Sequence, residues 1–246
     1  MGDGYVGVLM LGDGEFDKRV GDDGVEVWVT QMGGYMNMNT AFIDRESGIV
    51  AIVDPFDSER WVEALSEDGL SPTHLLYTHT HRDHVAGYSS MMSLVPDVEV
   101  WGHDEARVPG LLGHVVFKKV DFTDTWSNEP DTTVEWSAGS IALGVTHSPG
   151  HAPGHVTLHG HGVYHAGDLL FTNGMGRVDL PGSDPRAQWM SIRHAKGLLG
   201  SLPRDWRLIP GHRYDWIDGS TPDWVSVGEV LQHNYALNSP ALERMG

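Results

Sequence analysis

Residues of the types that bind metal ions stand at four places along this chain. Seven histidines and aspartates make up the set: His79, His81, Asp83, His84, His151, Asp168 and His212. Four of them fall within residues 79–84, a density that core packing does not explain. Neutral imidazoles and carboxylates suit zinc, iron or manganese. The pattern therefore predicts a metal centre assembled from distant segments of the chain.

Regular elements must carry these residues to one place. Residues 73–77, just before the first cluster, form an apolar run typical of a buried strand, and α/β proteins place their sites where such strands end. Similar runs predict strands at 25–30, 39–44, 49–54, 98–101, 134–136, 141–146, 155–158, 163–165 and 206–209. Helices are expected at 57–65, 85–94, from 104 onward, at 184–199 and at 223–237.

These elements fall into two similar halves with no linker between them. We therefore expect one compact domain over residues 25–246, in which sheets pack on sheets and helices lie outside. Residues 1–24 are rich in glycine and aspartate at their start, and we expect a poorly defined N-terminal segment there.

The composition narrows the class of protein. The chain has 246 residues, enough for a sizeable core, and no cysteine, which excludes disulfides and cysteine-ligated zinc. No stretch approaches the roughly 20 apolar residues that span a bilayer, and the N-terminus lacks the basic start of a signal peptide. We expect a cytoplasmic protein that acts on a small molecule. The sequence carries no signal for its oligomeric state.

The charge balance is unusual, with 34 acidic against 16 basic residues and a formal net charge of −18. Such a charge opposes binding to nucleic acid or to anionic membranes, because both depend on contacts between cations and phosphates. Only four basic residues are lysines. An acidic, lysine-poor composition is typical of halophilic proteins, although an ordinary acidic enzyme remains the alternative.

A halophilic origin predicts a melting temperature and an activity that rise up to molar salt. Salt shortens the Debye length from about 30 Å at 0.01 M to about 3 Å at 1 M and so screens repulsion among the acidic residues. Thermal melts in NaCl or KCl, with metal saturating, measure the effect. A melting temperature that is flat or falls between about 0.1 and 2 M would indicate an ordinary acidic protein.

Four motifs together resemble the metallo-β-lactamase fold superfamily, and the resemblance covers about residues 25–242. The motifs are Thr-His-Thr-His-Arg-Asp-His at 78–84, Ser-Pro-Gly-His-Ala-Pro-Gly-His at 148–155, Gly-Asp at 167–168 and Pro-Gly-His at 210–212. The resemblance implies an α/β fold of the αββα type, in which two mixed sheets pack face to face with helices on the outer faces.

The resemblance also implies a ligand set for two metal ions. His79, His81 and His151 are expected at the first site, and Asp83, His84 and His212 at the second. Asp168 is expected to bridge both ions. Two zinc ions are the expected cofactors, with iron or manganese as alternatives.

Within the superfamily, Gly-Asp-Leu-Leu-Phe at 167–171 and Gly-Met-Gly-Arg at 174–177 resemble the glyoxalase II group, which hydrolyses S-acyl glutathione thioesters. This implies a thioester hydrolase acting through a metal-bound hydroxide, which Asp83 would orient. Arg177 and Tyr214 are candidate substrate contacts. The chain departs from the group at Met175, where the family often has cysteine, and at Asp179, where glyoxalase II has tyrosine. It also lacks the group's basic C-terminal extension, so the thiol stays open.

Two other activities fit the same residues. His81, His151 and Asp168 could hold a single iron as two histidines and one carboxylate, as non-haem iron oxygenases do. The segment at 176–179 is similar to one in persulfide dioxygenases, which favours that alternative. A lactonase or β-lactamase would use the same binuclear chemistry on a ring, and the shape of the pocket decides between them.

Overall fold

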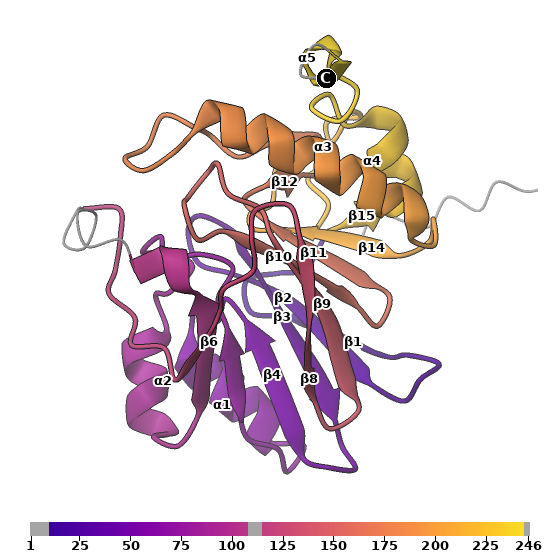
Figure 1. Cartoon of the computed structure of the whole chain (residues 1–246). Helices are drawn as coiled ribbons and strands as arrows, with labels where there is room; N and C mark the ends of the chain where they lie inside the picture. Colours follow the sequence, from indigo (N-terminus) through magenta and orange to yellow (C-terminus); the bar gives the residue numbers. More distant parts are fainter. Residues whose placement is uncertain (1–9, 108–114, 244–246) are drawn as a thin grey trace, which may run out of the picture.

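The computed structural model describes residues 10–107 and 115–243, and within them two mixed β-sheets lie face to face between helices (Figure 1). The first sheet has the strand order β1-β2-β3-β4-β5-β6-β7. Its strands are β1 (Phe16–Val20), β2 (Glu26–Met32), β3 (Asn37–Asp44), β4 (Ile49–Val53), β5 (His74–Leu76), β6 (Glu99–His103) and β7 (Asp124–Trp126). Neighbouring strands are antiparallel as far as β4 and parallel from β4 to β7.

The second sheet has the order β15-β14-β11-β10-β9-β8. Its strands are β8 (Thr133–Ala138), β9 (Ile141–His147), β10 (Val156–Gly160), β11 (Val163–Gly167), β14 (Arg207–Pro210) and β15 (Val225–Ser226). Here only β11 and β14 run parallel. A short hairpin of β12 (Leu170–Phe171) and β13 (Gly174–Met175) follows β11.

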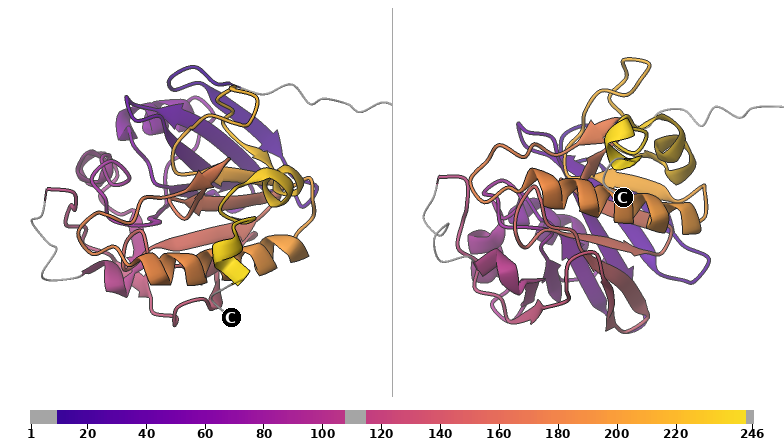
Figure 2. Two further views of the ribbon diagram at one scale, coloured as in Figure 1. Left: turned by 90° about the horizontal axis from the view of Figure 1, so that it is seen from above. Right: turned by 45° about the horizontal axis from the view of Figure 1, so that its top comes forward.

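Helices cover the outer faces of both sheets. The helices α1 (Ser58–Ser66) and α2 (Tyr88–Leu94) pack on the first sheet, and the 3₁₀ turn η1 (Asp104–Arg107) follows β6. On the second sheet lie α3 (Pro185–Ser201), α4 (Val227–His233) and α5 (Pro240–Glu243); Figure 2 shows α3 crossing that face with the yellow C-terminal helices beside it. The side chain of Asp184 accepts hydrogen bonds from two backbone N–H groups of α3, and Pro185 opens that helix, as N-terminal caps predict.

Alternating side chains divide the core into three apolar layers. Along β2, Val27 and Val29 point between the sheets and Trp28 points to the helices. The central layer joins these valines to Leu143 and Leu158 of the second sheet. Because β2 is buried on both faces, it is apolar on both faces as well. The expected αββα sandwich is therefore confirmed.

Several element boundaries differ from the sequence-based predictions. Residues 16–20 form β1 on the edge of the first sheet, within the segment that we expected to be poorly defined. The three-residue edge strand β7 was not predicted. The helix expected at 85–94 begins only at Tyr88, after a turn. The helix expected from Asp223 begins at Val227, because Asp223 is fully buried against Arg213 and Ser226 provides the capping box instead.

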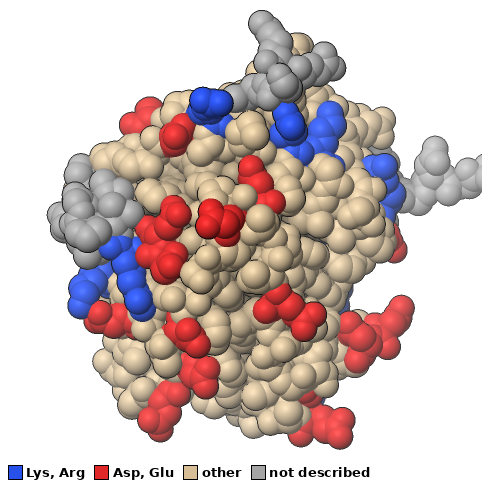
Figure 3. Space-filling view, in the orientation of Figure 1, with Lys and Arg blue, Asp and Glu red and all other residues tan. Residues whose placement is uncertain are grey.

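The described residues show whether any helix could span a membrane and how the surface charges are distributed. No helix within residues 10–107 and 115–243 is both long and apolar enough to cross a bilayer. On the face in Figure 3, acidic side chains are scattered from the upper left through the centre to the lower right, while basic side chains lie toward the top and at the left and right edges. The acidic groups on this face are dispersed, so salt would screen a diffuse repulsion.

Candidate metal centre

Four strand ends bring the predicted residues together at one side of the sandwich. The segment after β5 carries residues 79–84, and the loop after β9 carries His151. Asp168 directly follows β11, and His212 follows β14. The backbone of His212 also pairs with Asn37 at the start of β3, which ties the second sheet to the first. The site therefore lies across the line where the two sheets meet.

The first three histidines form one buried group. His79 Nε2 lies 3.1 Å from His81 Nδ1, and His151 Nε2 lies 2.9 Å from the same His81 nitrogen. All three residues are at most 5% exposed. Their ligand atoms lie close enough to hold one metal ion.

A second group lies beside the first. His212 Nε2 is 3.2 Å from Asp83 Oδ2 and 3.3 Å from His84 Nε2. The side-chain amide of Asn37 donates to the same Asp83 oxygen at 2.9 Å and so fixes its position. These three ligand-type residues could hold another metal ion.

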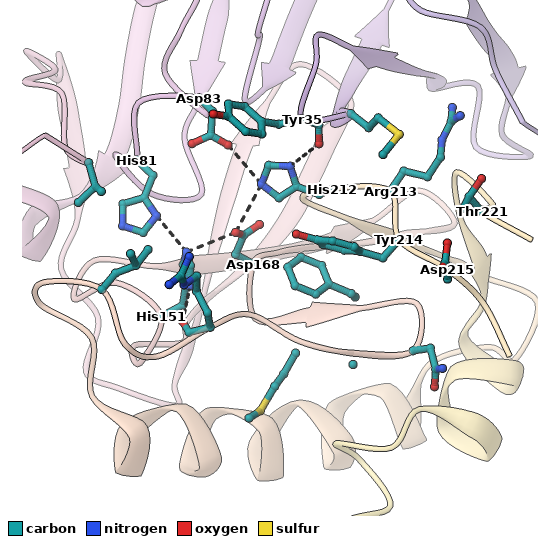
Figure 4. Close-up of a pocket in the computed structure, with 18 of the residues that line it drawn as sticks. Tyr35, His81, Asp83, His151, Asp168, His212, Arg213, Tyr214, Asp215 and Thr221 are labelled. Atoms are coloured by element: carbon teal, nitrogen blue, oxygen red, sulfur yellow. Dashed lines mark hydrogen bonds and ion pairs between the residues drawn. The ribbon is translucent and has the colours of Figure 1, made fainter. Parts of the chain in front are cut away.

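Asp168 lies between the two groups, as Figure 4 shows. Its Oδ2 is 3.3 Å from His151 Nε2 in the first group and 3.6 Å from His212 Nε2 in the second. Its Oδ1 is 3.4 Å from His84 Nε2. The carboxylate thus faces both groups, as a bridging ligand must.

Hydrogen bonds on the far side of the His151 and His212 rings fix which nitrogen of each faces the centre. His151 Nδ1 lies 2.7 Å from the carbonyl oxygen of Arg177, and His212 Nδ1 lies 2.9 Å from that of Tyr35. A carbonyl oxygen only accepts, so both Nδ1 atoms carry the proton. In the neutral rings, the unprotonated Nε2 therefore points inward. This is the arrangement that metal-binding histidines use.

Asp54 fixes two more rings in the same way. Its Oδ2 accepts from His84 Nδ1 at 2.8 Å and from the Thr78 hydroxyl at 2.5 Å. Because that hydroxyl donates to Asp54, it accepts from His79 Nδ1 at 3.0 Å, which leaves His79 Nε2 unprotonated. Asp54 could also join a metal group with His79 and His84. Its oxygens already accept these bonds, so we assign it the role of orienting ligands.

His155 supports Asp168 from behind. Its Nε2 accepts the backbone N–H of Asp168 at 3.0 Å, and its Nδ1 lies 2.9 Å from the Ser148 hydroxyl. His155 is absent from every group of side chains in the described residues that could hold a metal. This placement agrees with the interpretation that only the first histidine of the His-Ala-Pro-Gly-His segment faces the centre.

The donor set fits a metal pair. Nitrogens of neutral imidazoles that face one another at about 3 Å repel through their lone pairs unless a proton or a cation lies between them. The set contains five imidazoles and two carboxylates, the ligands that suit zinc and related ions. The residues present therefore fit the cofactor that the sequence predicts.

The two groups differ in the pKa values of their histidines. Burial lowers the pKa of His81 to about 3, and burial together with neighbouring imidazoles holds the pKa of His79 well below its usual value. Burial opposes the charged form of His84 too, but the carboxylates of Asp83 and Asp168 outweigh it and raise its pKa. The same balance, with Asp168 the largest attraction, raises the pKa of His212 to about 9. Without metal, the first group is neutral near pH 7 and the second binds protons.

Metal loading at neutral pH should therefore release protons from the second group. A metal needs neutral imidazole, so His84 and His212 must each lose a proton, up to about two per chain. Apparent affinity at this group should rise with pH at least as far as the His212 pKa of about 9. Calorimetric titration of metal into the metal-free protein, in buffers of different ionisation enthalpy, measures the release. Loading at pH 7 without any release would contradict this expectation.

Two glycines allow the close approach of the loops. A Cβ atom at Gly211 would lie 2.1 Å from Asp168 Oδ1 and 2.9 Å from His84 Cε1. A Cβ atom at Gly176 would lie 1.9 Å from the Asp168 carbonyl oxygen. Only glycine fits at these two positions.

A cavity of about 1080 Å³ opens beside both groups. His81, Asp83, His151, Asp168 and His212 contribute to its wall, and so do the two predicted substrate contacts, Arg177 and Tyr214. Ligand pockets typically hold roughly 300–1,000 Å³, so the space suits a small molecule of considerable size.

Several residues that shape this site were not predicted from the sequence. The carbonyl of Tyr35, the amide of Asn37 and the hydroxyl of Thr78 each hold a ligand-type side chain. Thr78 adjoins the histidine cluster and could have been suspected. Tyr35 and Asn37 lie far from it in sequence, and no local pattern marks them.

Comparison with known proteins identifies the family. The model of the metallo-beta-lactamase superfamily matches residues 34–212, which include all seven predicted ligands. The chain therefore belongs to the metallo-beta-lactamase superfamily.

Within that superfamily, curated relatives are hydroxyacylglutathione hydrolases. The protein of that name from Alkalilimnicola ehrlichii is 33% identical over 172 residues, which cover 70% of this chain and 59% of the relative. Hydroxyacylglutathione hydrolase GloC of Haemophilus influenzae is 30% identical over 212 residues, 82% of this chain and 93% of the relative. The chain spans about three fifths of the length of the first curated relatives that it matches.

Solved structures show the same fold. The BLEG-1 B3 metallo-beta-lactamase is 24% identical, with a TM-score of 0.70 over 87% of this chain and 100% of that one. TTHA1623 in a di-iron-bound form is 28% identical, with a TM-score of 0.63 over 84% of this chain and 98% of that one.

Proposed function

We propose that this protein is a binuclear metal-dependent hydrolase that cleaves thioesters. The observation that carries the proposal is the convergence of seven ligand-type side chains in two adjoining groups, with Asp168 facing both, beside an open cavity. The family and its hydroxyacylglutathione hydrolases support hydrolysis as the reaction class.

The seven ligand-type residues would be shared between two metal ions. His79, His81 and His151 would hold the first ion, and Asp83, His84 and His212 the second, with Asp168 shared. Two bound ions supply a hydroxide nucleophile near neutral pH and polarise the carbonyl of the substrate. Zinc is the proposed metal; the di-iron form of TTHA1623 supports a pair of ions and keeps iron open.

Asp83 is the ligand best placed to orient the nucleophile. Its side chain is 26% exposed, whereas that of His84 is 1% exposed, so its carboxylate reaches the cavity. Burial favours the neutral acid, but the positive charge at His84 and the bonds from His212 and Asn37 hold the pKa of Asp83 well below its usual value. The carboxylate therefore stays an acceptor at neutral pH, able to hold a hydroxide in line with the carbonyl carbon.

The substrate would lie along the cavity beside Arg177 and Tyr214. The Arg177 guanidinium donates to both oxygens of Asp179, at 2.6 and 2.7 Å, and both side chains are largely exposed. Asp179 neutralises this guanidinium, so Arg177 would meet the substrate as one half of an exposed ion pair rather than as a free cation. Tyr214 is 51% exposed and its ring can cover an acyl or thiol group.

Thiol release from S-D-lactoylglutathione and from a simple acetyl thioester tests the proposal, with lactones and β-lactams in parallel. The metal-loaded protein should cleave thioesters at a rate that rises with pH through the pKa of the metal-bound water and then levels. Metal analysis of the purified protein should give about two ions per chain.

Other outcomes would replace the proposal. Turnover of lactones or β-lactams alone would assign a ring hydrolase. Oxygen consumption with glutathione persulfide, one iron per chain and inert thioesters would assign the dioxygenase. A cytoplasmic location and a halophilic source stay predictions that these assays do not address.

A further inference from the structure

The cavity wall gathers the exposed apolar side chains of this protein. Ten large apolar residues are exposed in the described part of the chain, and five of them line this cavity. They are Tyr35, Met36, Val115, Tyr214 and Tyr235, which we call the apolar rim. Exposed apolar surface that collects at one cleft marks a binding site for an apolar group.

The tyrosines of the rim are held by the wall of the cavity. The Tyr214 ring lies on Phe171, with ring centroids 4.5 Å apart. The Tyr235 ring covers Gly174 so closely that a Cβ there would lie 2.9 Å from its Cε1. The carbonyl of Tyr35 accepts from His212 Nδ1, which joins the rim to the metal centre. The rings of Tyr214 and Tyr235, anchored in this way, offer contact area with little loss of freedom on binding.

The positive charges of the cavity are mostly in use. Arg213 is 8% exposed and its guanidinium donates to buried Asp223 and to the Leu11 carbonyl. Arg177 donates to both oxygens of Asp179. Among the arginines that line the cavity, only Arg82 has no hydrogen bond or ion pair from its guanidinium in the described residues. A ligand with two carboxylates would therefore find at most one free cation.

From this combination we propose that the cavity selects thioesters that carry a bulky apolar group and at most one free carboxylate. The apolar group, on either the acyl or the thiol side, would lie against the apolar rim. The proposal rests on the proposed thioester hydrolysis and adds the substrate class. Glutathione, a thiol with two carboxylates, would be a poor leaving group for this site compared with a neutral thiol.

Two series of thioesters test it on the metal-loaded protein. The first keeps the neutral thiol N-acetylcysteamine and lengthens the acyl group from acetyl to hexanoyl and phenylacetyl. The second keeps acetyl and changes the thiol from N-acetylcysteamine to phenylmethanethiol and glutathione. Since each methylene that the rim removes from water adds to binding, kcat/KM should rise at least about tenfold along one series. The series that rises tells which side of the thioester meets the rim.

Variants of the rim separate binding from a general loss of structure. Tyr235→Ala and Tyr35→Ala should each reduce severalfold the ratio of kcat/KM for the bulky substrate to kcat/KM for acetyl N-acetylcysteamine, through KM rather than kcat. Tyr235→Phe keeps the ring and should keep the preference. Ile217→Ala is the matched control, because Ile217 is 53% exposed and lies outside the cavity wall.

Three results would overturn the proposal. One is a higher kcat/KM for the glutathione thioester than for every neutral thioester of the panel. Another is an apolar preference that both tyrosine-to-alanine variants retain, with melting temperatures showing that they are folded. Hydrolysis of none of the thioesters would overturn the proposed function itself, and the substrate class with it.

Discussion

Asp168→Ala should lose the metal pair and nearly all turnover. Asp168 faces both ligand groups, with Oδ2 3.3 Å from His151 Nε2 and 3.6 Å from His212 Nε2. Its removal leaves each ion one ligand short and two buried groups without their shared negative charge. The fall in kcat/KM should exceed the roughly 10–100-fold loss that follows changes to residues that only orient ligands. Metal analysis after gel filtration, together with thioester kinetics, measures both effects.

Asp215→Asn is the matched control for this variant. Asp215 lines the same cavity but belongs to none of the groups that could hold a metal in the described residues. It should retain about two ions per chain. If Asp168→Ala also kept two ions and the kcat of the unaltered protein, Asp168 would not be a bridging ligand.

Gly211→Ala should damage the same centre without changing any ligand. The added methyl would lie 2.1 Å from Asp168 Oδ1 and 2.9 Å from His84 Cε1, both far inside van der Waals contact. Either the Asp168 carboxylate or the segment before His212 must move. Because productive geometry depends on displacements of about 1 Å, we expect at least a hundredfold loss of kcat/KM and weaker metal binding.

Gly34→Ala provides the comparison. A Cβ at Gly34, in the turn between β2 and β3, meets no atom within 4 Å. Its metal content and activity should match those of the unaltered protein. Circular dichroism and melting temperatures establish whether Gly211→Ala is folded. A folded Gly211→Ala protein with full metal content and full activity would contradict this expectation. It would show that the segments carrying Asp168 and His212 can move apart without disturbing the metal centre.

The layered fold was predictable because the core strands are recognisable from their own apolar residues and the turns between them. The runs at 39–44 and 49–54 become β3 and β4, since both are apolar and joined by a turn. The edge strand β1 is largely polar and exposed, so its pairing with β2 decides its conformation rather than its own composition. Asp223 misled the prediction of the last helix because a partner distant in sequence, Leu11, accounts for its burial together with Arg213.

The site likewise combines residues that a local sequence pattern identifies with residues that only the fold brings together. The spacing of residues 79–84 identifies ligand candidates, because no packing role needs such a density of imidazoles. The apolar rim could not be predicted, since Tyr35, Tyr214 and Tyr235 come from three separate loops. Each looks like an ordinary surface tyrosine until the fold places it at the cavity.

The position of the site across the meeting line of the two sheets has a mechanical consequence. A chain without cysteine has no disulfide to join its halves. An ion held by His79, His81 and His151 would connect a loop of the first sheet to a loop of the second, and such a cross-link restricts the unfolded chain. Because folding and metal binding are then coupled, chelators should lower the melting temperature. The supply of metal would thus set how long the protein survives as well as how fast it works.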